Sequence, residues 1–126
     1  MRVLGVDDNV DILKLVQITV ESLGHAFESA PGGVPGLDKI RNNQYDLVLL
    51  DLSMPDMTGL EVIDALVEDG IIKKQRVVLF TASYLGVEDL ESKLREKGVH
   101  SILAKPVDLD QLMDRLQQIE SEVEST

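Results

Sequence analysis

The sequence predicts an α/β fold in which a five-stranded parallel sheet is flanked by five helices. Short apolar runs recur along the chain, and segments with helical spacing of apolar residues separate them. Most of the runs are continuous rather than alternating, as expected of parallel strands that are buried on both faces. Strands that alternate with helices in this way form one sheet through right-handed crossover connections.

The elements follow one another in a regular order. Strands are predicted at Val3–Val6, His25–Ala30, Leu47–Leu50, Val77–Phe80 and Ile102–Ala104. The second run mixes polar and apolar residues, so it is assigned to an edge of the sheet. Apolar stripes predict helices over Ile12–Leu23, Leu60–Val67, Val87–Leu94 and Leu109–Val123, and the first three are closed by Gly24, Gly70 and Gly98.

The second helix and the C-terminal tail are the weakest parts of this pattern. Pro31–Gly36 is rich in proline and glycine, which disfavour a helix, so only about Leu37–Asn42 is expected to be helical. The acidic tail, about residues 120–126, is expected to fray. The length of 126 residues fits a single domain over 1–126.

Composition narrows the classes of function. The net charge is −11, from 12 Lys and Arg against 23 Asp and Glu, so direct binding to nucleic acids or anionic membranes is not expected, whereas divalent cations and basic partner surfaces are favoured. The chain has no cysteine, which excludes disulfides and thiolate metal sites. No segment has the length of a membrane span and no export signal is visible, so we expect a cytoplasmic protein.

Polar residues stand at the ends of four apolar runs. Asp51 ends the run Leu47–Leu50, Asp7-Asp8 follows the first strand, Thr81 follows the fourth, and Lys105 follows the fifth. A carboxylate at the end of a buried strand needs a partner or a task. Because ligands of parallel sheets bind at the carboxyl ends of the strands, we expect these side chains to share one pocket.

The chemistry of this pocket points to phosphoryl transfer. Three carboxylates that lie together repel one another, and Mg²⁺ is the natural cation to offset them because it prefers oxygen ligands. Lys105 adds a positive charge and Thr81 a hydroxyl donor for a phosphoryl group. A carboxylate oxygen of Asp51 could then attack phosphorus and form an aspartyl phosphate.

These residues resemble the receiver domain of two-component response regulators, including chemotaxis receivers. The resemblance covers essentially the whole chain and depends on Asp7-Asp8, Asp51 with Met54–Gly59, Thr81-Ala82 and Lys105-Pro106. It implies a flavodoxin-like three-layer sandwich with strand order 2-1-3-4-5. It also implies that Asp51 is the phosphoacceptor. Mg²⁺ would be bound by Asp8, Asp51 and the backbone carbonyl of Ser53, with Asp7 acting through a metal-bound water.

The resemblance implies a switch as well, but the chain departs from the family at one of its positions. Lys105 and Thr81 would sense the phosphoryl group, and the Lys105-Pro106 bond is cis in the family. Most receivers have Tyr or Phe three residues before the lysine, whereas this chain has Ile102. Tyr84 is the one nearby aromatic residue that could substitute for it.

Two serines are expected to set the lifetime of the aspartyl phosphate. Ser53 and Ser83 stand two residues beyond Asp51 and Thr81, where the family places side chains that border the attacking water. A serine has no acid or amide group with which to orient that water, so we expect slow self-dephosphorylation. His25 and His100 have no ligand-spaced partner and are expected to be surface residues.

The leading hypothesis is a phosphorelay switch. A histidine kinase or phosphotransfer domain would donate the phosphoryl group, and the face formed by the fourth helix, the fifth strand and the fifth helix would then engage a downstream target or a fused output domain. The protein would promote its own phosphorylation and dephosphorylation without being a turnover enzyme, as a monomer or a phosphorylation-dependent dimer. The alternative is a constitutive interaction module on the same fold.

Two other classes fit less well, and one question stays open. An aspartate-nucleophile phosphatase would have an acid two residues after Asp51, where this chain has Ser53, and a flavin carrier would have a phosphate-binding loop after the first strand. Whether the chain is a stand-alone receiver or a fragment of a longer protein is not determined by these features.

Overall fold

The structure, a computed structural model, describes residues 1–82, 87–106 and 108–125, without the side chains of 87–89. Five parallel strands form one sheet in the order β2-β1-β3-β4-β5, as the family resemblance implied. The strands are β1 Arg2–Val6, β2 Ala26–Ala30, β3 Leu47–Asp51, β4 Arg76–Thr81 and β5 Ser101–Ala104. The helices are α1 Val10–Ser22, α2 Gly33–Asn42, α3 Gly59–Glu68, α4 Val87–Lys97 and α5 Leu109–Glu124, with the short 3₁₀ helix η1 Ile72–Lys74 before β4.

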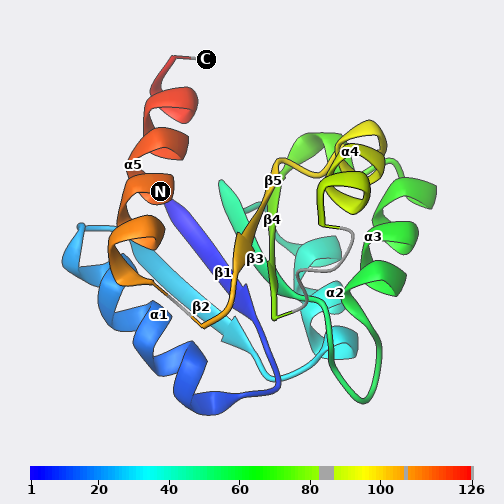
Figure 1. The fold of residues 1–126 in the computed structure, drawn as a ribbon, viewed down its shortest axis with the longest axis horizontal. Coiled ribbons are helices and arrows are strands. Elements are labelled where there is room, and N and C mark those ends of the chain that lie inside the picture. The colour runs from blue at the N-terminus through cyan, green and yellow to red at the C-terminus, as the bar shows by residue number, and fades with distance from the viewer. Residues whose placement is uncertain (83–86, 107, 126) are drawn as a thin grey trace.

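Helices cover both faces of the sheet and produce three layers. Helices α1 and α5 lie on one face, and α2, α3 and α4 lie on the other (Figure 1). Along β3, side chains alternate between the faces, so that Leu47 and Leu49 pack with α1 and α5 whereas Val48 and Leu50 pack with α2 and α3. Every residue of β3 is buried, which explains why its sequence is a continuous apolar run.

Helix α2 is longer than the sequence predicted, and that prediction was wrong. It begins at Gly33 rather than near Leu37 and includes Pro35 and Gly36. Pro35 lies in the first turn, where its missing N–H would have had no partner inside the helix. Gly36 allows close packing on β1, because a Cβ there would lie 2.6 Å from Cγ1 of Val6.

The three glycines expected to close helices all lie at positive φ: Gly24 at 85°, Gly70 at 72° and Gly98 at 114°. This left-handed conformation suits glycine because it has no Cβ. None of the described helices combines the length and the apolarity needed to cross a membrane.

The first histidine differs from expectation, and much of the acidic tail is helical. Helix α5 continues through Glu124, and the fraying of the tail stays a prediction. His25 is buried rather than on the surface, with Nε2 2.8 Å from Oε2 of Glu120, although the two do not align as a hydrogen bond. His100 is half-buried, and its Nε2 lies 2.9 Å from Oε2 of Glu122. Glutamates near the end of α5 thus lie against histidines that precede β2 and β5, which composition alone could not predict.

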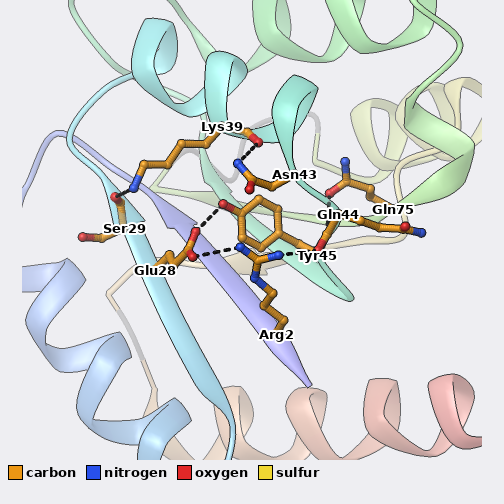
Figure 2. Close-up of polar contacts among 8 residues, drawn as sticks. All are labelled: Arg2, Glu28, Ser29, Lys39, Asn43, Gln44, Tyr45 and Gln75. Carbon is orange, nitrogen blue, oxygen red and sulfur yellow. Dashed lines mark hydrogen bonds and ion pairs between the residues drawn. The ribbon is translucent and has the colours of Figure 1, made fainter.

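A polar cluster lies toward the amino ends of the strands and is shown in Figure 2. We call Arg2, Glu28, Tyr45 and Gln75 the Tyr45 cluster. The Tyr45 hydroxyl donates to Glu28, and the Arg2 guanidinium pairs with Glu28 at 3.0 Å while stacking 4.8 Å above the Tyr45 ring (Figure 2). Gln75 accepts the N–H of Tyr45 at 3.3 Å and donates to the carbonyl of Ile40 at 3.2 Å.

Candidate functional site

The polar residues predicted at the strand ends converge at the carboxyl edge of the sheet. Asp7 follows β1, Asp51 ends β3, Thr81 ends β4 and Lys105 follows β5. Strands β1 and β3 are neighbours, and β4 and β5 continue the sheet, so four strand ends far apart in sequence meet at one place. We call Asp7, Asp8, Asp51 and Lys105 the Asp51 pocket.

The three aspartates of the pocket lie close together. Each offers a carboxylate oxygen within 4.8 Å of the others, and no other three His, Cys, Asp or Glu side chains within the described ranges form such a group. Asp7 and Asp51 are buried, whereas Asp8 is exposed. Asn9 caps α1 by accepting the N–H groups of Asp11 and Ile12, so neither aspartate is used as the cap of that helix.

Lys105 places its ammonium between the two buried carboxylates. Its Nζ donates to Oδ2 of Asp7 at 2.9 Å and to Oδ1 of Asp51 at 3.0 Å. The backbone holds this arrangement, because the N–H of Lys105 donates to the carbonyl of Thr81 at 2.8 Å and joins the ends of β4 and β5. Thr81 itself is buried.

The pKa values of Asp51 and Lys105 are both raised above their ordinary values. Burial is the main cause that raises the pKa of Asp51 above its ordinary value; the hydrogen bond from Lys105 lowers it, and the charge of Asp7 raises it. Burial lowers the pKa of Lys105, but its hydrogen bonds to Asp7 and Asp51 raise it by more. Both groups therefore bind their protons more tightly in the folded protein, as expected where one ammonium faces several carboxylates.

This donor set fits a hard divalent cation. Carboxylate oxygens are the ligands that Mg²⁺ prefers, and one exposed carboxylate beside two buried ones leaves the site open to solvent. The chain has no cysteine, and no histidine belongs to the group, so the donors do not suit a thiolate or imidazole metal site.

The remaining predicted site residues differ in where they lie. Ser53 is exposed, and its backbone N–H approaches the carboxylate of Asp51 closely enough to lower the pKa of that group. The Lys105-Pro106 peptide bond is cis. Ile102 is half-buried and packs against the core shared by α2, α3 and α4. Ser83 and Tyr84 lie outside the described residues.

Asp56 has a structural role that its sequence context did not predict. Its carboxylate accepts the backbone N–H groups of Gly33 at 3.0 Å and Val34 at 2.9 Å, at the start of α2. The only signal for this was a Gly-rich helix start without a side chain able to cap it, and the partner lies more than twenty residues further along the chain.

Comparison with known protein families decides the assignment. The family model described as the response regulator receiver domain matches residues 3–117. This chain belongs to that family. Receiver domains are signalling modules of two-component response regulators rather than typical turnover enzymes.

Known receivers resemble this one over nearly their full length. The polar-differentiation response regulator DivK of Brucella anthropi is 27% identical over 114 residues, which cover 90% of this chain and 91% of DivK. The response regulator TrrA of Thermotoga maritima, solved in complex with Mg²⁺ and BeF, has a TM-score of 0.79 and 28% identity, covering 94% of this chain and 97% of its own.

A third relative comes from an assembly. A chain of the CheX–CheY–BeF₃–Mg²⁺ complex from Borrelia burgdorferi aligns with a TM-score of 0.84 and 29% identity, covering 94% of this receiver and 88% of that chain. The likeness therefore includes receivers solved with Mg²⁺, with a fluoride complex of beryllium or with a partner protein.

Proposed function

We propose that this receiver is a phosphorylation-controlled switch of a two-component phosphorelay and that Asp51 is its phosphoacceptor. The observation that carries the proposal is the position of the Lys105 ammonium, which bridges Asp7 and Asp51 at 2.9 and 3.0 Å. A buried nucleophilic carboxylate, a fixed positive charge and further carboxylates able to hold a cation are the parts that phosphoryl transfer requires, because its catalysis is mainly positioning and charge neutralisation.

The donor in this proposal is a phosphohistidine of a histidine kinase or phosphotransfer domain. An oxygen of Asp51 forms the new bond to phosphorus while the bond from phosphorus to the histidine nitrogen breaks. The phosphoryl group gives Asp51 an acyl phosphate, and the released histidine nitrogen takes up a proton from water. Lys105 compensates charge on the phosphoryl oxygens, and the Thr81 hydroxyl donates to one of them.

Mg²⁺ is the cofactor in this proposal. Asp8, Asp51 and the backbone carbonyl of Ser53 would hold it, with Asp7 beside them. When bound, the ion would supply positive charge that offsets both the carboxylates and the incoming phosphoryl group. Titrating Mg²⁺ into the wild type and into Asp8→Asn tests this set, since the variant should bind Mg²⁺ at least tenfold more weakly.

The output in this proposal is a changed surface on α4, β5 and α5 that binds a downstream target or a fused output domain. A groove between β5 and α5 is lined by Ile102, Ala104 and Arg115. Ile102 also favours the second candidate, a constitutive interaction module, because its aliphatic side chain has no ring that could turn between the core and this surface.

Serines at positions 53 and 83 would make the phosphorylated state long-lived. Neither Ser53 nor Ser83 can orient the attacking water as an acid or amide would. The rate of phosphoryl loss should therefore increase in Ser83→Glu, and an unchanged or slower rate would contradict this part of the proposal.

Phosphorylation can be tested directly by intact-mass measurement. The wild type is incubated with Mg²⁺ and acetyl phosphate or a phosphorylated phosphotransfer domain, and Asp51→Asn serves as the control. We expect one added phosphoryl group in the wild type and none in the variant. An unmodified wild type, or an equal gain by Asp51→Asn, would contradict the assignment. Beryllofluoride then separates the candidates, because a constitutive module should show no spectral change on α4, β5 and α5.

A further inference from the structure

The start of α2 is capped by a residue from another part of the chain. Gly32, at the capping position, has no side chain, and the Asp56 carboxylate accepts the N–H groups of Gly33 and Val34 instead. These hydrogen bonds, Val34 first and then Gly33, lower the pKa of Asp56. A carboxylate at this position also interacts favourably with the helix dipole. The first turn of α2 therefore depends on Asp56.

The contact between the two segments is tight. A Cβ on Gly32 would lie 2.8 Å from Oδ2 of Asp56, and one on Gly33 would lie 2.4 Å from the carbonyl oxygen of Met57. A larger residue at Gly33 would meet the backbone of Met57 and push the two segments apart, whereas one at Gly32 would displace the carboxylate of Asp56. The glycines that make this segment look unsuited to a helix thus allow it to pack against residues 56 and 57.

Asp56 belongs to the loop that connects Asp51 to α3. The base of the loop is closed by the N–H of Gly59, which donates to the carbonyl of Leu52 at 2.9 Å, and its end is fixed by the capping box of Thr58 and Glu61. Ser53 lies between this base and Asp56. The loop is therefore held at two places, by its own base and by the start of α2.

We infer that Asp56 is a positioning residue that couples the loop carrying Ser53 to the first turn of α2. The inference deepens the proposed function, because it requires that the Asp51 pocket bind Mg²⁺ and a phosphoryl group. Coupling between binding events is reciprocal. If α2 helps to fix the loop for the cation, binding at the pocket must in turn stabilise the first turn of α2.

Through this coupling, binding at the pocket can change an exposed part of the protein without involving Ile102. Val34, whose N–H is held by Asp56, is 57% exposed. A change in the order of this turn is therefore displayed directly to solvent, on the opposite face of the sheet from α1 and α5 (Figure 1).

The test measures Mg²⁺ affinity and amide hydrogen exchange in the wild type, Asp56→Ala and Asp56→Asn. In the wild type, Mg²⁺ with beryllofluoride should slow the exchange of the Gly33 and Val34 amides. In Asp56→Ala these amides should exchange faster and lose that response, and Mg²⁺ should bind about tenfold more weakly, as for other supporting residues of metal sites. Asp56→Asn keeps one acceptor oxygen and should fall between the two.

Asp46→Ala is the matched control. Asp46 also accepts a backbone N–H from a distant segment, that of Arg2 at 2.7 Å, but at the opposite edge of the sheet, so its loss should leave Mg²⁺ binding unchanged. Equal weakening in Asp46→Ala, or unchanged affinity and amide response in Asp56→Ala, would overturn the coupling alone. A wild type that binds neither Mg²⁺ nor beryllofluoride would overturn the proposed function and the coupling with it.

Discussion

The Asp51 pocket and the Tyr45 cluster bring charged groups together toward opposite ends of the strands of one sheet, but they balance those charges differently. In the Tyr45 cluster, hydrogen bonds from Tyr45 and then Arg2 lower the pKa of Glu28, so its charge is stabilised. In the Asp51 pocket, burial and the neighbouring Asp7 raise the pKa of Asp51 despite its bond to Lys105. The charges of the Tyr45 cluster are thus balanced within the cluster, whereas the Asp51 pocket carries a negative charge that a ligand could offset.

Under the proposed function, this difference separates a structural network from a site that is phosphorylated. A satisfied polar network adds to the stability of the fold. A site that must bind a cation and accept a phosphoryl group costs stability when it is empty, and functional sites commonly show this trade-off. Substitutions in the two regions should therefore change stability in different ways.

Removing the ammonium of Lys105 from the Asp51 pocket should have the largest effect on stability. In Lys105→Ala, Asp7 and Asp51 lose their shared partner while both stay buried, and the free energy of unfolding should fall by about 3 kcal/mol without metal. Urea denaturation with and without Mg²⁺ measures this, and Mg²⁺ should recover part of the loss. Lys105→Arg, which keeps the charge, is the control. A loss that Mg²⁺ leaves untouched would argue against charge imbalance as its cause.

Neutralising the carboxylate of Asp51 should have the opposite effect on stability. Asp51→Asn removes a buried charge whose raised pKa shows that the fold disfavours it, so the metal-free protein should become more stable by about 1 kcal/mol. Thermal unfolding in the presence of a chelator measures the change. A clearly destabilised Asp51→Asn protein would mean that the ion pair with Lys105 outweighs the cost of burying the charge.

Substitution in the Tyr45 cluster should cost stability without affecting the site. Tyr45→Phe keeps the buried ring but removes the hydroxyl that donates to Glu28, for a loss of about 1 kcal/mol. Mg²⁺ affinity and phosphoryl acceptance should match those of the wild type. A change in either would show that the two regions communicate across the sheet.

The two regions should also respond differently to pH. Burial and then Glu28 raise the pKa of Tyr45 to about 12, so its contribution to stability is complete below the unfolded value of 10.0 and is lost as the pH rises from there to about 12. Absorbance of the phenolate in the wild type and in Tyr45→Phe follows this step. An ordinary titration of Tyr45 near pH 10 would contradict the network.

At acidic pH, protonation of Glu28 and of Asp51 should change the stability of the fold in opposite directions. The stabilisation from Glu28 is present above its unfolded pKa and is lost as the pH falls through its lowered folded pKa. The cost of the Asp51 charge is present above its raised folded pKa and disappears as the pH falls through it toward 3.8. Carboxyl-carbon resonances of the two residues, recorded during acid titration without metal, should show that Glu28 has a lower pKa than Asp51. This is the reverse of the ordinary order of Glu and Asp.

Much of the fold was predictable because its signals are local. The continuous apolar strands, the helix-closing glycines and the polar residues at strand ends all depend on neighbours in the sequence, and strand order 2-1-3-4-5 followed from the family resemblance. The meeting of Asp7, Asp51 and Lys105 was predictable because parallel strands place their carboxyl ends at one edge.

The parts that were missed depend on contacts between distant segments. Helix α2 begins early because Asp56 caps it from another loop, and His25 is buried because α5 passes over it. The Tyr45 cluster joins residues from four separate segments whose sequences carry no shared pattern. Such contacts appear only once the elements are packed.

The dependence of stability on Mg²⁺ tests the central claim most directly. A ligand that binds only the folded state stabilises it in proportion to the logarithm of its concentration once the site is saturated. We predict that the free energy of unfolding of the wild type and of Tyr45→Phe rises with Mg²⁺ in parallel, and that the response is lost in Asp51→Asn. An unresponsive wild type, or a response that persists in Asp51→Asn, would contradict the account.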